Sequence, residues 1–307
     1  MHIPDGFVSL PVAAVTGLAT VTAITISLSR SQDNFGLRQA PIMGLTTAFI
    51  FAAQMINFPV LGGTSGHLLG GALAAVILGN PWAATLCIST VLLIQGLLFA
   101  DGGITALGAN ILNMGIIGVW TGWGLTQTLQ RLIGGSKNRL PLAAGIAAGV
   151  SVVVAAIACS LELILSGTAE PAIILPAMTG IHALIGIGEG IITAGVLTYL
   201  AQVRPDLLPG DRPQLQKWLV PVVATLLIAG VLSLFASAWP DGLEKVAEMQ
   251  GFLPLAENVR VKIPTPFADY EIEGLGAIGT SISGIIGTLI CFGAAFGIAQ
   301  FVKPKDA

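Results

Sequence analysis

The sequence contains few charged residues. Lys, Arg, Asp and Glu together make up 9% of the 307 residues, whereas 54% of the residues are hydrophobic. A soluble domain typically has about 25% charged residues, so this chain has too few to cover a water-exposed surface. A lipid environment needs no such cover. The composition therefore excludes a water-soluble globule and indicates a chain that lies mostly in a lipid bilayer.

Cysteine and net positive charge are also scarce. Cys87, Cys159 and Cys291 are odd in number, far apart and each in an apolar run, which excludes a disulfide scaffold. A net charge of -3 gives no basic field for nucleic-acid phosphates, so we expect no nucleic-acid partner. The sequence has no GxxxxGK[ST] phosphate-binding loop, no HExxH motif and no GxSxG motif in a suitable context. We therefore expect a protein that is not an enzyme and has no ATP site.

Long apolar runs predict transmembrane helices, because a helix satisfies its own backbone hydrogen bonds in lipid and the runs lack period-two alternation. Besides eight longer runs, a shorter run at 68–79, which is third in chain order, supplies only about a dozen apolar residues. It is either a short tilted span or a re-entrant piece buried in protein. The predicted fold is all-α and polytopic. The eight longer runs are 7–29, 41–57, 81–100, 103–128, 141–165, 173–201, 218–239 and 275–302.

The distribution of basic residues predicts the orientation, because cytoplasmic loops are enriched in Lys and Arg. If the N-terminus lies outside and all nine segments cross, Lys245, Arg260 and Lys262 lie outside and the other ten basic residues lie inside. We therefore expect nine spans in the cell's inner (plasma) membrane and a cytoplasmic C-terminus. The ten inner residues are Arg30, Arg38, Arg131, Lys137, Arg139, Arg204, Arg212, Lys217, Lys303 and Lys305.

A proline-rich polar segment divides the chain into two predicted units. Residues 1–203 hold seven expected spans, residues 204–217 form a linker expected in the cytoplasm, and residues 218–307 form a two-span hairpin. Residues 240–274 are the expected outer loop of this hairpin. They carry seven acidic and three basic residues.

The first two residues have the chemistry of a metal chelator. Met1-His2 has no preceding basic region, so we expect no cleaved signal peptide, and the bulky His2 is expected to protect Met1 from removal. A free terminal amine, the next backbone nitrogen and Nδ1 of His2 can then form fused chelate rings on the outer face.

His67 is the candidate for a fourth nitrogen ligand, since it follows the loop 57–66 on the same expected side. Four nitrogens in one plane suit Ni(II) or Cu(II), with Co(II) possible, and do not suit Zn(II), Mg(II) or Ca(II). Binding through deprotonated nitrogens should weaken in acid. The competing interpretation is that His2 and His67 are ordinary surface or hydrogen-bonding residues.

His182 and Glu189 form a second pair of interest. They are seven residues apart and therefore nearly on one helical face within an expected span, where ionisable groups usually have a partner or face a cavity. They could orient the metal loop or relay protons, or they could be a buried polar pair that joins helices. Thr64 and Ser65, which precede His67, are further candidates to surround the ion.

Three motifs resemble one family. The start MHIPDGF, the loop GGTSGHLLGG around His67 and the run MTGIHALIGIGEGIIT around His182 are similar to the CbiM/NikM metal-binding subunits of energy-coupling-factor transporters for cobalt and nickel. The segment 240–244, PDGLE, resembles the hairpin of the CbiN/NikN accessory subunits. The chain therefore resembles a natural fusion of the two.

This resemblance implies a function and a site. It implies that the amine of Met1, the backbone nitrogen and ring of His2, and the ring of His67 hold the ion. It further implies that a separate transmembrane coupling subunit and ATP-binding cassette ATPases supply the energy. The chain is thus expected to capture Ni(II) as transported substrate.

Three other functions stay open at this point. Co(II) uptake for cobalamin synthesis would use the same nitrogens. A secondary transporter driven by the ion gradient would need an intramembrane relay, for which His182 and Glu189 are the candidates. A structural assembly protein with an inert metal motif would bind no transition metal.

Overall fold

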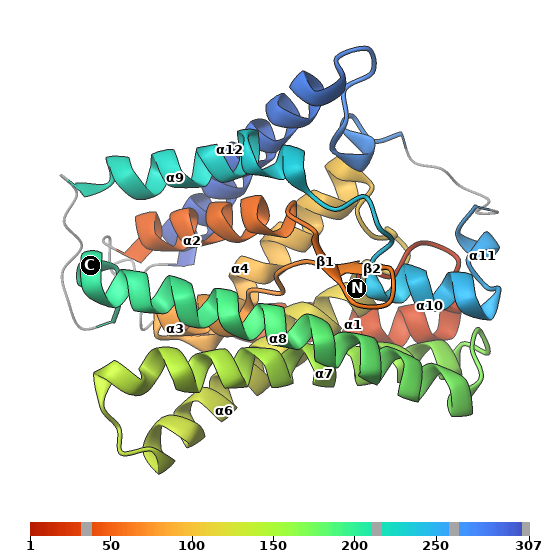
Figure 1. Cartoon of the computed structure of the whole chain (residues 1–307), viewed down its shortest axis with the longest axis horizontal. Helices are drawn as coiled ribbons and strands as arrows, with labels where there is room; N and C mark the ends of the chain where they lie inside the picture. Colours follow the sequence, from red (N-terminus) through yellow and green to blue (C-terminus); the bar gives the residue numbers. More distant parts are fainter. Residues whose placement is uncertain (32–38, 210–216, 258–263, 303–307) are drawn as a thin grey trace.

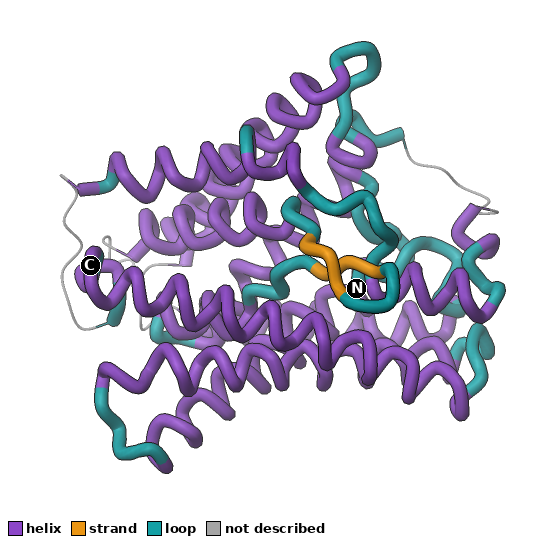
Figure 2. The backbone as a smooth tube through the Cα atoms, in the orientation of Figure 1, coloured by secondary structure: helices purple, strands orange, loops and turns teal. Residues whose placement is uncertain are grey.

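The computed structural model describes residues 1–31, 39–209, 217–257 and 264–302, and it is almost entirely helical (Figure 2). This confirms the predicted all-α polytopic class. Within the described residues, five helices are long and apolar enough to cross a membrane: Leu10–Ser31, Pro81–Phe99, Lys137–Leu165, Pro171–Val203 and Gly276–Val302. The total of nine spans stays a prediction.

The N-terminal unit consists of helices and one short hairpin (Figure 1). Asn80 begins α4 by accepting hydrogen bonds from two backbone N–H groups, with Pro81 at the first helical position. The elements are α1 (Leu10–Ser31), α2 (Gln39–Gln54), β1 (Phe58–Val60), β2 (Thr64–Gly66), α3 (Gly71–Leu78), α4 (Pro81–Ile94) with the π-helical turn η2 (Gln95–Phe99), α5 (Leu107–Asn110) with the π-helical stretch η3 (Ile111–Gly118), α6 (Val119–Leu132), η4 (Lys137–Arg139), α7 (Leu140–Leu165), α8 (Pro171–Val203) and η5 (Pro205–Leu207).

The C-terminal unit adds two helices against α2. The antiparallel α2 and α12 pack along their length, and α9 contacts both of them, so these three helices form one flank of the molecule while α6, α7 and α8 form the other (Figure 1). The elements are α9 (Leu219–Gly230), η7 (Leu232–Phe235), α10 (Gly242–Gln250), α11 (Pro254–Glu257), η8 (Ala268–Tyr270) and α12 (Gly276–Val302).

The short apolar run 68–79, third in chain order, is only partly helical. Its helix α3 has eight residues, about 12 Å at 1.5 Å per residue, and residues 67–70 before it are not helical. Glu189 accepts hydrogen bonds from the backbone N–H groups of Leu69 and Gly70, so these N–H groups need no helical partner. Non-helical backbone is tolerated within a membrane protein where it is surrounded by protein, and residues 68–77 are buried in this way.

Two other expected runs begin or end differently in the structure. The run 103–128 is helical only from Leu107, because Gly103 and Thr105 instead hydrogen bond to the N-terminal segment. The run 218–239 leaves the α-helix after Gly230, whose carbonyl accepts a hydrogen bond from the Ser281 hydroxyl. That carbonyl would otherwise accept from Leu234, which donates to Val231 in a short 3₁₀ turn.

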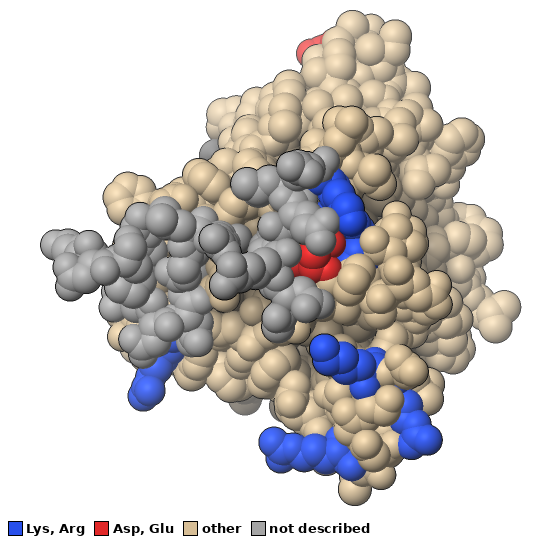
Figure 3. Space-filling view, turned by 90° about the vertical axis from the view of Figure 1, so that its left-hand side faces the viewer, with Lys and Arg blue, Asp and Glu red and all other residues tan. Residues whose placement is uncertain are grey.

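The loops lie at two ends of the molecule. One end holds the N-terminus, the β1–β2 hairpin and α10 (Figure 1). At the other end, Gly79 lies against Pro209, and Met43 of α2 packs in one cluster with Ala299 and Val302 of α12. Figure 3 shows this second end, where Lys and Arg side chains gather with few acidic ones.

Candidate metal centre

The first residues of the chain run into the interior and are held by an amide side chain. Asn110 Oδ1 accepts a hydrogen bond from Ile3 N at 2.7 Å, and its Nδ2 donates to Ile3 O at 3.0 Å. Gly103 N also donates to Ile3 O, at 2.8 Å. Asp5 then accepts hydrogen bonds from the backbone N–H and the hydroxyl of Thr105. A Cβ atom at Gly103 would collide with the backbone of Asp5, so glycine permits this close approach.

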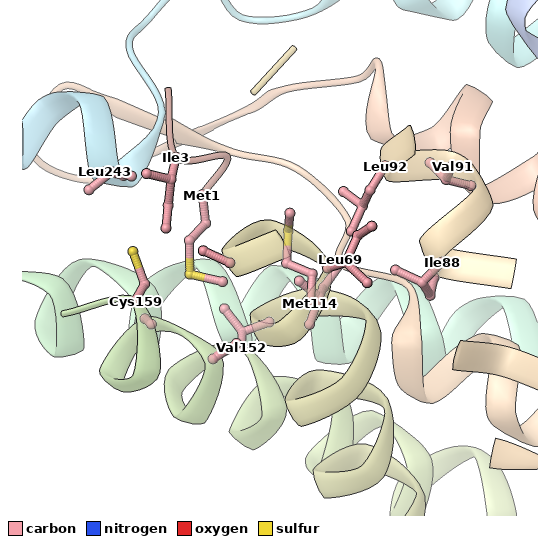
Figure 4. Close-up of a cluster of buried hydrophobic side chains, with 14 of the residues drawn as sticks. Met1, Ile3, Leu69, Ile88, Val91, Leu92, Met114, Val152, Cys159 and Leu243 are labelled. Carbon is pink, nitrogen blue, oxygen red and sulfur yellow. The ribbon is translucent and has the colours of Figure 1, made fainter. Parts of the chain in front are cut away.

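The side chains of the N-terminal segment pack in the core. Met1 is 6% exposed and Ile3 is fully buried. Figure 4 shows the Met1 thioether directed toward Val152 and Cys159 of α7, with Ile3 beside Leu243. Hydrophobic burial and backbone hydrogen bonds therefore fix the position of the terminal amine.

The terminal amine lies next to His67. Met1 N is 3.1 Å from His67 Nε2, and His67 Nδ1 is 3.0 Å from the carbonyl oxygen of Leu68. Because a carbonyl only accepts, Nδ1 carries the proton and Nε2 has a lone pair directed at the amine. Burial, with the positive charge of the amine, lowers the pKa of His67 to about 3. The ring is therefore neutral at pH 7, the form that binds a metal.

The separation between the amine and His67 matches two neighbouring ligands of one ion. Metal–nitrogen bonds of about 2.0–2.1 Å place adjacent corners of a square about 2.8–3.0 Å apart, and the observed distance is 3.1 Å. The arrangement therefore brings two of the expected nitrogens to bonding geometry with little movement.

The His2 ring lies beside His67, but its Nδ1 contacts Asp101 and not the terminal amine. Its ring stacks on the His67 ring, with centroids 4.9 Å apart and an interplanar angle of 17°. Its Nδ1 is 3.0 Å from Asp101 Oδ1, and its buried Nε2 has no hydrogen-bond partner among the described residues. Burial opposes ionisation of Asp101, but His2 and the hydroxyl of Tyr270, at 2.5 Å, outweigh it and hold the pKa of Asp101 below its usual range. Chelation through Nδ1 requires release of this contact.

Glu189 positions the loop that follows His67. Its two carboxylate oxygens accept from Leu69 N at 2.6 Å and Gly70 N at 2.9 Å, and its side chain is fully buried in α8. Glu189 does not contact the amine or either imidazole through any hydrogen bond in the described structure. This geometry favours the orienting role over the proton relay.

The other three candidate residues face the C-terminal unit. Thr64 Oγ1 donates to Pro240 O at 3.0 Å, and Ser65 Oγ donates to Trp239 O at 2.7 Å. His182 Nδ1 is 2.8 Å from Met178 O. A Cβ atom added to Gly242 would lie 2.9 Å from the His182 ring. These residues therefore form the surface on which the segment 239–242 rests.

Asp241 is the residue of this segment that reaches the site. Its Oδ2 is 2.7 Å from the terminal amine. Burial would raise the pKa of Asp241, but the positive amine and the N–H of Glu244 hold that pKa below its usual range. The sequence pattern PDGLE marks this segment, but nothing local in it indicates contact with residue 1.

A cavity of about 510 Å³ is lined by residues of both units, including His2 and His67. Its lining combines the two histidines with acidic groups from both units: His2, His67, Asp101, Asp241, Glu244 and Asp269. Asp269 and Tyr270 both have positive φ, 53° and 61°, a strained conformation for residues other than glycine. This strained turn directs the Tyr270 hydroxyl onto Asp101.

Side chains alone do not form a metal site in the described part of the chain. No group of three or more His, Cys, Asp and Glu side chains is placed there to hold an ion. The terminal amine, 3.1 Å from His67 Nε2, is the additional nitrogen nearest to the imidazoles at this position. Asn110, Asp101, Asp241 and Tyr270, which shape this site, were not assigned by the sequence patterns, because their contacts join segments about a hundred or more residues apart.

The sequence matches two known families. Residues 2–207 match CbiM, described as the cobalt uptake substrate-specific transmembrane region, and residues 215–304 match the PDGLE domain. A relative from Archaeoglobus fulgidus, provisionally named a fused nickel transport protein NikMN, is 38% identical over 309 residues, covering 99% of each chain. The fused nickel transport protein NikMN of Rhodobacter capsulatus is 34% identical, covering 78% of this chain and 75% of the relative.

A solved structure supports the same assignment. The crystal structure of a truncated transition metal transporter superimposes with a TM-score of 0.59 at 36% identity, covering 66% of this chain and 99% of that one. These matches confirm the resemblance that the three sequence motifs indicate. The chain is therefore a multi-pass membrane subunit of the CbiM/NikM family of nickel and cobalt transport proteins, fused to a PDGLE domain of the NikN type.

Proposed function

We propose that this chain captures Ni(II) at the outer face of the cell membrane through four nitrogens: the amine of Met1, the backbone nitrogen and Nδ1 of His2, and Nε2 of His67. The single observation that carries the proposal is the 3.1 Å separation between the amine and His67 Nε2. The terminal amine is buried with Asp241 as its ion-pair partner and has His67 Nε2 as a second neighbour, so both nitrogens can offer a lone pair to one ion once the amine loses its proton. This is a suitable arrangement for a cation that takes nitrogen ligands.

Capture requires two local changes in the protein. The amine and the backbone N–H of His2 must lose protons, so binding releases protons and weakens in acid. Nδ1 of His2 must also leave Asp101, which is 3.0 Å away in this structure. The Asn110 bonds act on Ile3, not on His2, so they can persist while His2 turns toward the ion.

The cavity between the units supports an access path from the outer side. Acidic groups from both units line it, and a cleft lined by one sign of charge concentrates the opposite ion. Arg131 lies in the last turn of α6, and Lys137 and Arg139 lie in η4 just before α7, at the opposite end of the molecule. Because Lys and Arg favour the cytoplasmic side, this distribution supports an outward-facing site and a cytoplasmic C-terminus.

Energy for transport is proposed to come from separate subunits. The sequence has no phosphate-binding loop, and the family to which the chain belongs consists of transport components, not enzymes. We therefore propose an energy-coupling-factor complex with a transmembrane coupling subunit and ATP-binding cassette ATPases. A gradient-driven mechanism is not favoured, because both oxygens of Glu189 are used by backbone N–H groups.

Nickel is proposed ahead of cobalt because the relatives named as fused proteins are named for nickel. One of them aligns over 99% of this chain. Cobalt transport proteins CbiM from Sorangium cellulosum and Geobacter sulfurreducens, 35% and 30% identical, cover 70% and 81% of it. The fused architecture, and not coverage alone, therefore carries the preference.

Calorimetric titration of the purified full-length protein with Ni(II) tests the proposal. The protein should begin at Met1, as checked by mass spectrometry, and should bind one equivalent of nickel. His2→Ala and His67→Ala should both lose high-affinity binding, whereas His182→Ala should weaken it less. High-affinity binding that survives in His67→Ala would refute the four-nitrogen site.

A further inference from the structure

The PDGLE segment, residues 240–244 of the C-terminal unit, lies directly against strand β2, which immediately precedes His67. Ser65 N donates to Pro240 O at 2.8 Å, and Ser65 pairs with Asp241 in a parallel β-bridge. The hydroxyls of Thr64 and Ser65 donate to Pro240 O and Trp239 O. These contacts extend the β1–β2 hairpin by one residue of the second unit, and they place Asp241 beside the start of the chain.

Asp241 uses its two carboxylate oxygens for two different partners. Oδ1 accepts from Glu244 N at 2.8 Å and so caps helix α10, while Oδ2 lies 2.7 Å from the terminal amine. The amine has His67 Nε2 as its other partner, at 3.1 Å. The direction of the amine is therefore set by one residue from each unit.

We propose that Asp241 is a positioning residue for metal capture, which holds the terminal amine beside His67 before the ion arrives and stays bonded to it afterwards. The inference rests on the proposed four-nitrogen site. It assigns to the PDGLE unit a direct part in that site: the unit supplies the acceptor that orients a ligand.

The chemistry of a coordinated amine permits this contact in both states. A metal takes one lone pair from the amine nitrogen, and the two remaining N–H groups can still donate to a carboxylate. The charge near Asp241 is also similar, because a divalent ion bound to one deprotonated amide nitrogen leaves one net positive charge where the ammonium was. Groups that orient metal ligands in this way typically contribute about 10- to 100-fold to metal affinity.

The capping role of Asp241 can be separated from its contact with the amine. Asn and Ser cap helices about as well as Asp does, so Asp241→Asn and Asp241→Ser should keep α10 folded. Both remove the carboxylate from the amine. Glu248→Gln is the matched control, since it removes one negative charge from an exposed position of the same helix, where Glu248 pairs with Lys245.

Calorimetric titration of the full-length variants with Ni(II), with visible absorption of the bound ion, tests the inference. We expect both Asp241 variants to bind about 10- to 100-fold more weakly, Glu248→Gln to bind within about twofold to threefold of the parent, and all to show the parental nickel spectrum at saturation. The spectrum reports the donor set, so it would change if the site itself had collapsed.

Three outcomes would overturn the inference. These are parental affinity in both Asp241 variants, an equal loss in Glu248→Gln, and an altered spectrum at saturation. Loss of binding in His67→Ala with parental affinity in the Asp241 variants would refute the positioning role alone. Parental binding in His67→Ala would instead refute the proposed function on which the inference rests.

Discussion

Asn110 pairs with the backbone of Ile3 through both polar atoms of its side-chain amide, at 2.7 and 3.0 Å. The two residues are 107 positions apart, and the pairing fixes the peptide that directly follows His2. Asn110 ends α5, where the chain passes into a π-helical stretch, a feature found often at functional sites. The proposed metal site therefore depends on how the N-terminal peptide is held, as well as on its ligands.

Asn110→Ala should destabilise the protein and weaken nickel binding. The substitution leaves the buried N–H of Ile3 without its acceptor, which costs about 1–3 kcal/mol, and it frees the peptide that carries three of the four proposed nitrogen ligands. We expect lower thermal stability and an affinity for Ni(II) reduced about 10-fold. Asn138→Ala, at an exposed position in η4, is the control and should change neither. Parental nickel affinity in Asn110→Ala would show that the peptide is held by other contacts.

Two residues added before Met1 should abolish high-affinity binding. The addition converts the terminal amine into an amide nitrogen and places new residues where Asp241 and His67 now meet the amine. Calorimetry on a chain that begins Gly-Gly-Met-His should show no high-affinity nickel binding; two residues are used because Gly-Met-His would place a histidine third and create a new four-nitrogen chelator. A chain extended by two residues at its C-terminus should bind as the parent does. Tight binding by the N-terminally extended chain would exclude the amine as a ligand.

Glu189→Gln should weaken nickel binding without removing a ligand. Both oxygens of Glu189 accept backbone N–H groups just after His67, and the amide of Gln would place a donor against one of them. We expect about a 10-fold loss of affinity, measured by the same titration. Glu170→Gln, at the exposed N-cap of α8, is the matched control. Equal affinity in the two variants would leave Glu189 with a packing role only.

The metal-free protein should lose stability in acid through His67. Its pKa falls from 6.5 to about 3 in the folded protein because of burial and the neighbouring amine. A group whose folded pKa is depressed binds fewer protons when folded, so stability declines as the pH falls below about 6.5 toward 3. Melting curves at pH 7 and pH 5 in the presence of a chelator should show a smaller shift for His67→Gln than for the parent. An equal shift would assign the acid sensitivity to other groups.

The sequence by itself determined the membrane class, the helical fold and most helix positions. These follow from local properties, since 20-residue apolar windows have one stable form in lipid. It also indicated Met1, His2 and His67, because the chelating capacity of an N-terminal Met-His lies in adjacent atoms. The structure places Met1 N against His67 Nε2.

The tertiary structure alone decided which groups surround those ligands. The local sequence around Asn110, Asp101 and Asp241 does not indicate their contacts with the N-terminal segment, because these contacts arise from packing between distant segments. The third run could not be resolved from composition, because an extended stretch and a short helix have the same hydropathy as a span. Its form depends on Glu189, 120 residues away from Leu69, which takes the backbone N–H groups that a helix would otherwise use. Long-range hydrogen bonds in the buried interior therefore set the shape of the site, whereas local hydrophobicity set the helices that carry it.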